Sequence, residues 1–117
     1  MSVTVYGIVN CDTVKKARAH LATQGVDYTF HDFKKQGVPA DELDRWIAAV
    51  GWQALVNRSG TTWRKLPDET RAAVVDAASA RRLMLDQASV IKRPVVDWGG
   101  GRITVGFDAA AWEHAAG

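Results

Sequence analysis

The sequence predicts an α/β domain built on a mixed β-sheet, and three patterns along the chain carry this prediction. A strand pattern rich in β-branched residues is followed by a helical pattern and a second strand pattern, which is the order of a parallel β-α-β unit. Several helical patterns fill the middle of the chain. Two short strand patterns joined by Gly99-Gly100-Gly101 then predict an antiparallel hairpin. A parallel half that meets an antiparallel hairpin makes the sheet mixed.

The first third of the chain predicts strand, helix and strand. Apolar residues alternate with polar ones over residues 3–9, which predicts the first strand. Asp12 or Thr13 is expected to cap the helix that follows, and Gly25 is expected to end it. The apolar residues of this helix share one face: Val14, Ala17 and Leu21. Alternation near residues 27–32 predicts the second strand.

The next segments predict short helices and loops. Residues 34–37 are expected to form a polar loop, after which Pro39 lies in the first turn of a helix that Gly51 ends. Residues 52–56 predict one more helical turn. Residues 57–65 are dense in hydrogen-bonding groups and predict a loop.

The last third predicts two helices, the hairpin and a final helix. A helix is predicted over residues 67–78, and Ser79 is expected to cap another that ends near Gln87. Strands flank the three glycines, and Asp108 is expected to cap a short helix through Trp112. The order β-α-β, then helices, then β-β-α is that of the thioredoxin fold with a helical insertion between its two halves.

Length and composition predict a single domain spanning residues 1–117. One cysteine cannot form an internal disulfide, which favours a reducing compartment. The net charge of +2 attracts polyanions weakly, so we expect small anions as ligands, and not nucleic acid. No run approaches the roughly 18 apolar residues of a membrane span, and no signal peptide pattern opens the chain. We therefore expect a cytoplasmic monomer that does not bind membranes.

Cys11 is the candidate catalytic residue because it lies where a strand gives way to a helix. Free amides of the first helical turn and the helix dipole stabilise a thiolate at such a position. Lys15 adds positive charge, whereas Asp12 opposes ionisation unless it turns away. Asn10, Asp12 and Thr13 border the thiol and are candidates for binding the substrate or glutathione. The alternative is a small buried apolar cysteine, but the junction favours a functional thiol.

Val14 occupies the position at which a Cys-x-x-Cys motif has its second cysteine. A dithiol relay within one chain is therefore excluded. Any intermediate on Cys11 must be resolved by a thiol from another molecule, and glutathione is the abundant cytosolic candidate.

Three arginines are candidates for binding an anion. Arg93 precedes Pro94, and in a thioredoxin-like sheet this proline is typically cis and lies opposite the cysteine. Arg58 and Arg64 bracket residues 59–62, which could bind an anion or form an ordinary solvated loop. Most tryptophans are expected in the core, with Trp63 covering the site. The three histidines are scattered, so no metal site is expected.

Three segments resemble the ArsC/Spx/YffB family of thioredoxin-fold proteins: Tyr6–Ala17, Asn57–Arg64 and Ile91–Val95. The resemblance covers nearly the whole chain and is greatest to the YffB-like branch. Members of that branch are often labelled arsenate reductase-related and are proposed to be glutathione-dependent thiol reductases.

In the family's arsenate reductases, one cysteine attacks arsenate among three arginines, with glutathione and glutaredoxin as reductants. The resemblance implies that Cys11 is the nucleophile, Arg93 the arginine before the cis proline, and Arg58 the middle arginine. The third arginine has no counterpart, since residues 105–107 take its place, and the histidine before the nucleophile is replaced by residues 7–8. Both departures count against efficient arsenate reduction.

The leading expectation is a monothiol reductase with no bound cofactor, with glutathione as co-substrate and a small anionic or disulfide substrate. Arsenate reduction coupled to glutathione and glutaredoxin is the second reading. The third is an Spx-like regulator that binds RNA polymerase, although Val14 removes the Cys-x-x-Cys switch typical of that branch.

Overall fold

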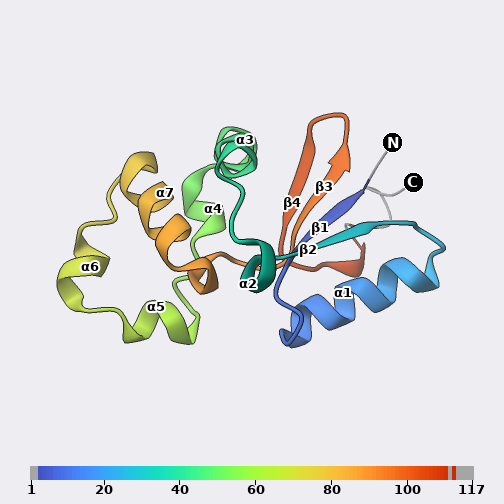
Figure 1. Ribbon diagram of the computed structural model, residues 1–117, viewed down its shortest axis with the longest axis horizontal. Helices are drawn as coiled ribbons and strands as arrows, with labels where there is room; N and C mark the ends of the chain where they lie inside the picture. The colour runs from blue at the N-terminus through green and yellow to red at the C-terminus, as the bar shows by residue number, and fades with distance from the viewer. Residues whose placement is uncertain (1–2, 111, 113–117) are drawn as a thin grey trace. The chain divides into compact units, whose positions relative to one another are not determined.

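The computed structural model describes residues 3–110 and 112 (Figure 1). The chain divides into two compact units, which we call the sheet unit and the helical unit. The sheet unit comprises Met1–Gln36 and Arg93–Gly117, and the helical unit comprises Gly37–Lys92. The sheet unit contains β1 (Thr4–Gly7), α1 (Asp12–Thr23), β2 (Thr29–Asp32), α2 (Phe33–Gln36), β3 (Val95–Gly99) and β4 (Arg102–Val105). The helical unit contains α3 (Ala40–Val50), α4 (Trp52–Leu55), α5 (Thr61–Lys65), α6 (Asp68–Ala72), α7 (Ala77–Asp86) and the 3₁₀ turn η1 (Ala88–Val90).

The four strands form one mixed sheet in the order β2-β1-β3-β4. β1 runs parallel to β2 and antiparallel to β3, and β3 pairs antiparallel with β4. Val5 lies opposite Phe30 on one side and Val96 on the other. The predicted thioredoxin-like fold is therefore confirmed, with the helical segment inserted between the β-α-β half and the hairpin.

The core of the sheet unit lies between the sheet and α1, which runs along one face of the strands (Figure 1). Alternation along β1 sends Val5 to this face, where the buried side of α1 meets it. The other buried members of this core are Ala17, Leu21, Val96, Trp98 and Trp112. The Trp98 indole N–H donates to the Thr104 hydroxyl at 2.8 Å, which satisfies the polar atom of a buried ring. Each large side chain buried here contributes about 1.5–3 kcal/mol to stability.

Tyr6 points to the opposite face of the sheet. Its ring stacks on Phe33 with 6.4 Å between centroids and lies 5.1 Å from the ring of His31. Burial leaves Tyr6 only 7% exposed. Both faces of the central strand β1 are thus covered, as expected for the middle of a sheet.

The helical unit has its own core, formed by the apolar sides of α3, α4, α7 and η1. Its buried members include Leu43, Trp46, Leu55, Leu83, Met84 and Val90. A short bridge between Val56 and Ile91 joins the residue that follows α4 to the residue that follows η1. On the surface, Arg81 Nε donates to Asp44 Oδ1 at 2.6 Å and so ties α7 to α3. An exposed pair of this kind contributes at most about 1 kcal/mol.

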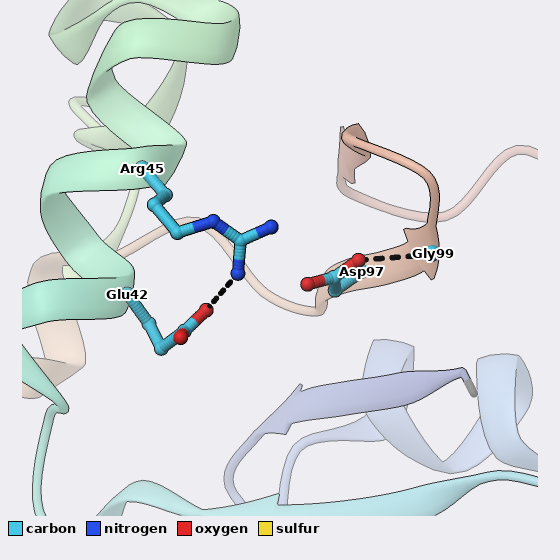
Figure 2. A network of polar contacts seen from close by, with 4 residues as sticks. All are labelled: Glu42, Arg45, Asp97 and Gly99. Atoms are coloured by element: carbon cyan, nitrogen blue, oxygen red, sulfur yellow. Dashed lines mark hydrogen bonds and ion pairs between the residues drawn. The ribbon is translucent and has the colours of Figure 1, made fainter. Parts of the chain in front are cut away.

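Figure 2 shows a local polar contact in each unit. In α3, Arg45 Nη1 donates to Glu42 Oε2 at 2.6 Å, one helical turn away. In β3, the backbone N–H of Gly99 donates to Asp97 Oδ1 at 2.9 Å. The second contact lies where the register of β3 with β4 shifts, so the Asp97 carboxylate accepts from an amide at this irregularity.

Two segments predicted as loops contain short helices. Residues 34–37 were expected to be a polar loop, yet α2 extends to Gln36 because Asp32 accepts the Lys34 amide at 2.9 Å and caps the turn. The second half of the predicted loop 57–65 is α5, whose first bond runs from the Arg64 amide to the Gly60 carbonyl at 3.2 Å. Pro39 is the N-cap of α3 and does not lie in its first turn.

The helix predicted over residues 67–78 opens where predicted but ends at Ala72, and the predicted cap at Ser79 is wrong. The structure has α6 and α7 with an interruption between them, and Asp76 caps α7. Asp76 accepts the Ser79 amide at 2.9 Å, while the Ser79 hydroxyl accepts the Asp76 amide at 3.1 Å. This reciprocal capping box starts a new helix three residues before the predicted position.

The predicted glycine turn of the hairpin and the predicted cap at Asp108 agree with the structure, and residue 111 of the predicted last helix lies outside the described residues. Gly99-Gly100-Gly101 joins the two strands of the hairpin, and all three glycines have positive φ. The Asp108 carboxylate accepts the Ala110 amide at 3.1 Å, as a capping residue does. Within residues 3–110 and 112, no helix is long and apolar enough to cross a bilayer.

Candidate functional site

Cys11 is the N-cap residue of α1. Its backbone is extended, with φ −84° and ψ 124°, and its carbonyl accepts the Lys15 amide at 2.9 Å. The expectation that Asp12 or Thr13 caps this helix is therefore wrong, because the helix already begins at Asp12. An N-cap side chain lies beside the free amides of the second and third helical residues, which here are Thr13 and Val14.

A close approach between β1 and α1 positions this junction. A Cβ atom added to Gly7 would lie 2.8 Å from Val14 Cγ2, which is closer than real contacts allow. The last residue of β1 can therefore reach the first turn of α1 only as glycine. The turn between them is closed by the Cys11 amide, which donates to the Ile8 carbonyl at 3.1 Å.

The surroundings of Cys11 lower the pKa of its thiol below the ordinary value. Partial burial is the largest single influence and raises the pKa, but the other influences together outweigh it. The Val14 amide, the Arg93 guanidinium acting as donor and as positive charge, and the Thr13 amide all favour the thiolate. The sulfur makes no capping hydrogen bond of regular geometry, so these amides act as nearby oriented dipoles.

Arg93 and Pro94 lie immediately before β3, in the same unit as Cys11. The Arg93–Pro94 peptide bond is cis, as predicted. Pro94 is buried, and its carbonyl accepts the Gly106 amide at 2.9 Å, which fixes the chain beside β4. The structure thus brings Arg93 to the sulfur of Cys11.

The other residues predicted around the thiol lie at the surface of the sheet unit. Asn10, Asp12, Thr13 and Lys15 are all exposed, and Cys11 itself is partly exposed. A half-exposed thiolate with exposed polar neighbours is accessible to a dissolved disulfide or oxyanion. Among the described residues, no group of three His, Cys, Asp or Glu side chains could hold a metal ion.

Arg58 and Arg64 belong to the helical unit. Arg58 occupies the turn between α4 and α5, and Arg64 lies in the last turn of α5. Both side chains are exposed. A role for either arginine at the Cys11 thiol remains a prediction.

Sequence reasoning missed the partners of Arg58. Its guanidinium carbon lies 5.5 Å from the centroid of the Trp52 ring and 5.9 Å from that of Trp63, within the range of cation–π contacts. Trp52 is among the tryptophans expected in the core, yet it is only half-buried. The available signal was a tryptophan on either side of an arginine within residues 52–63.

Comparison with known proteins identifies the family to which the chain belongs. The family model described as ArsC family matches residues 6–115. An uncharacterised protein of Haemophilus influenzae is 34% identical over 113 residues, which is 97% of this chain and 97% of that protein.

Two solved structures are similar over almost the full chain. A YffB protein is 47% identical with a TM-score of 0.93, covering 99% of this chain and all of that one (100%). An arsenate reductase (ArsC) related protein from Brucella melitensis is 57% identical with a TM-score of 0.76, covering 97% of this chain and 93% of that one. The chain that carries Cys11 at its strand-to-helix junction is therefore a YffB-like member of the ArsC family.

Proposed function

We propose that this protein is a glutathione-dependent monothiol reductase that acts through Cys11. The observation that carries the proposal is a partly exposed cysteine whose pKa is lowered by Arg93 and by the amides of the first turn of α1. It is the one cysteine of the chain, so the thiol that resolves an intermediate must come from another molecule.

The reaction proceeds in two exchanges. The Cys11 thiolate attacks the glutathione sulfur of a mixed disulfide between glutathione and a substrate thiol. The old sulfur–sulfur bond breaks, the substrate leaves as a thiolate that takes a proton from water, and Cys11 is left bonded to glutathione. A second glutathione thiolate then attacks the glutathione sulfur on Cys11, which releases the Cys11 thiolate and oxidised glutathione. In sum, the mixed disulfide and one free glutathione give the free substrate thiol and oxidised glutathione, so one disulfide is exchanged for another.

Each predicted site residue has a part in this proposal. Arg93 stabilises the thiolate, both as attacking and as leaving group, and the cis Arg93–Pro94 segment offers backbone groups to the peptide. Asn10, Asp12 and Thr13 line the approach to the sulfur. Arg58 binds an anionic group of glutathione, with Lys15 and Arg64 as accessory charges.

The test is to incubate the reduced protein with oxidised glutathione and measure its mass. We expect one glutathione per chain, lost on treatment with dithiothreitol, and no adduct on Cys11→Ser. The adducted protein should release the modification faster with glutathione than a short unstructured cysteine peptide does. An unmodified wild-type chain, or an equal adduct on Cys11→Ser, would overturn the proposal.

Reduction of arsenate is the second candidate, favoured by the 57% identity to an arsenate reductase (ArsC) related protein. In that reaction arsenate accepts two electrons and loses one oxygen as water, while two thiols become a disulfide. Glutathione and glutaredoxin would supply the thiols. The missing third arginine weighs against it. Arsenate turnover with both reductants, abolished in Arg93→Ala, would establish it, and turnover no faster than without protein would rule it out.

A further inference from the structure

The aromatic surroundings of Arg58 set it apart from the other arginines of the helical unit. We call Trp52, Arg58 and Trp63 the arginine cage. Trp52 is the first residue of α4, Trp63 lies in α5, and the guanidinium of Arg58 lies 5.5 Å and 5.9 Å from the two ring centroids. Both indoles are half-buried, whereas Arg58 is exposed. The two rings hold the side chain while its charge still faces solvent.

A tight turn fixes the backbone beneath the cage. The Asn57 amide donates to the Val90 carbonyl at 2.8 Å, which anchors the turn to η1. The side-chain oxygen of Asn57 accepts a hydrogen bond from the Ser59 amide at 3.2 Å. The backbone carbonyl of Asn57 accepts one from the Gly60 amide at 3.3 Å. A Cβ atom at Gly60 would lie 2.9 Å from Asn57 Nδ2, so a larger residue there would displace the Asn57 amide. The turn therefore holds the Cα atom of Arg58 in place, and the two rings hold its guanidinium.

Three of the five other arginines of this unit are paired with carboxylates. Arg45 pairs with Glu42, Arg71 with Asp68, and Arg81 with Asp44. Within the described part of the chain, Arg58 has no carboxylate partner. Contacts with aromatic rings use the faces of a guanidinium and leave its N–H edges available. A positioned guanidinium with free edges is prepared to bind a planar anion through two parallel hydrogen bonds.

We propose that Trp52 and Trp63 are positioning residues that prepare Arg58 to bind a carboxylate of glutathione. The inference rests on the proposed function for its ligand. A carboxylate fits because the cage offers one positive charge and one planar fork, which match a planar monoanion. A tetrahedral dianion such as phosphate or arsenate would call for further donors. The flanking rings already restrict the Arg58 side chain in the free protein, so it loses less conformational entropy when a ligand binds.

The binding test uses the Cys11→Ser chain, in which no disulfide can form, and S-methylglutathione, which keeps both carboxylates but has no thiol. We expect the indole N–H signals of Trp52 and Trp63 to shift on titration in an NMR spectrum, and the dimethyl ester of the ligand to cause much smaller shifts. Equal shifts with phosphate would mean that the cage does not select carboxylates, and no shift would mean that it does not bind them. Either result would overturn the proposal.

Variants separate positioning from general stability. Loss of a cation–π contact at an exposed site corresponds to a change in affinity of about two- to fivefold. Trp52→Leu and Trp63→Leu should therefore each weaken binding by about that factor. Trp52→Phe and Trp63→Phe keep an aromatic face and should restore most of the affinity. Arg58→Lys keeps the charge but loses the planar fork, and should weaken binding about tenfold. The control is Lys65→Ala, which removes an exposed charge from α5 outside the cage.

Kinetics complete the test and keep the two proposals distinguishable. With Cys11 present, the leucine variants should raise KM for glutathione and leave the pH profile of Cys11 alkylation unchanged. If the Cys11→Ser chain binds S-methylglutathione at the cage but the wild type forms no mixed disulfide, the reductase proposal fails and the cage stands. If the mixed disulfide forms and the cage variants leave KM and affinity unchanged, or if the phenylalanine variants bind no better than the leucine variants, the cage proposal fails.

Discussion

Ionisation of Cys11 is the residue-scale property on which the chemistry depends. The amides at the start of α1 and the Arg93 guanidinium lower the pKa of the thiol despite its partial burial. We therefore expect the rate of alkylation by iodoacetamide to rise with pH around an apparent pKa below the value of about 8.5 for a free cysteine. Arg93→Gln should move this apparent pKa upward.

The matched control is Lys16→Gln, which removes an exposed charge from the same helix without touching the sulfur. Its profile should resemble that of the wild type. The same shift makes stability depend on pH: a lowered pKa stabilises the folded state above the unfolded pKa, and this contribution disappears as pH falls through the folded value. The stability advantage of the wild type over Cys11→Ser should therefore grow as pH rises toward about 8.5. A wild-type apparent pKa equal to that of a free thiol would contradict the assignment.

Gly7 is the second residue-scale constraint, because it lets β1 reach α1. Gly7→Ala places a methyl group 2.8 Å from Val14 Cγ2 in a buried contact. Such overpacking costs about 1–3 kcal/mol, measurable as a lower midpoint of urea unfolding. Val14→Ala removes the opposing methyl groups, so the double variant should lose less stability than the two single changes summed. If the losses in free energy of unfolding simply add in the double variant, the contact with Val14 is not what makes alanine unfavourable at position 7.

At the scale of elements, the capping box decides where α7 begins. Asp76 accepts the Ser79 amide, and this bond lowers the pKa of the Asp76 carboxyl. Asp76→Ala should therefore lower the thermal midpoint near pH 7. A lowered carboxyl pKa stabilises above the unfolded pKa and loses its effect as pH falls through the folded value. The difference between wild type and Asp76→Ala should thus shrink below about pH 4.

Asp76→Asn provides the control for this cap. Asparagine accepts the same amide but does not titrate, so its thermal midpoint relative to Asp76→Ala should hardly vary with pH. Thermal unfolding followed by circular dichroism between pH 3 and pH 7, a range chosen around the carboxyl value of about 3.9, measures all three chains. A wild-type advantage over Asp76→Ala that stays constant down to the lowest pH would mean that the ionised carboxylate does not act as the cap.

The sequence predicted those elements whose periodicity spans several residues. The strands, α1 and α3 follow from alternation or from one apolar face, and the structure contains them. α2 and α5 have four and five residues, too few for a helical period to appear, and their starts depend on local bonds. Asp76 and Ser79 are both good capping residues three positions apart, so composition alone does not choose between them.

The candidate site was predicted in part for the same reasons. The cis proline and the meeting of Arg93 with Cys11 follow from the fold, which the order of elements indicates. That Cys11 occupies the N-cap position of α1 was missed, because cysteine is not among the preferred N-cap residues. The arginine cage was missed because it joins residues from α4, a turn and α5, and no single periodicity connects them.

At the scale of the whole molecule, burial is distributed unevenly. α1 buries Val14, Ala17 and Leu21, and strand β3 has a mostly buried pattern. By contrast, α5 and α6 contain no buried residues among those described. Segments with few buried apolar contacts open locally at low free energy, and binding segments are often drawn from them. The turn that carries Arg58 is followed directly by such a segment.

This distribution predicts the pattern of amide hydrogen exchange. In the free protein, amides of α5 and α6 should exchange much faster than those of α1 and β3, which should exchange only in global unfolding. Destabilising the sheet unit with Gly7→Ala should speed exchange in α1 and β3, while the fast exchange of α5 and α6 stays as it is because it does not pass through global unfolding. Exchange measured by NMR at several low urea concentrations separates local from global opening, since only global opening depends steeply on urea. Equal protection and equal urea dependence in all four elements would show instead that the chain opens as one cooperative body.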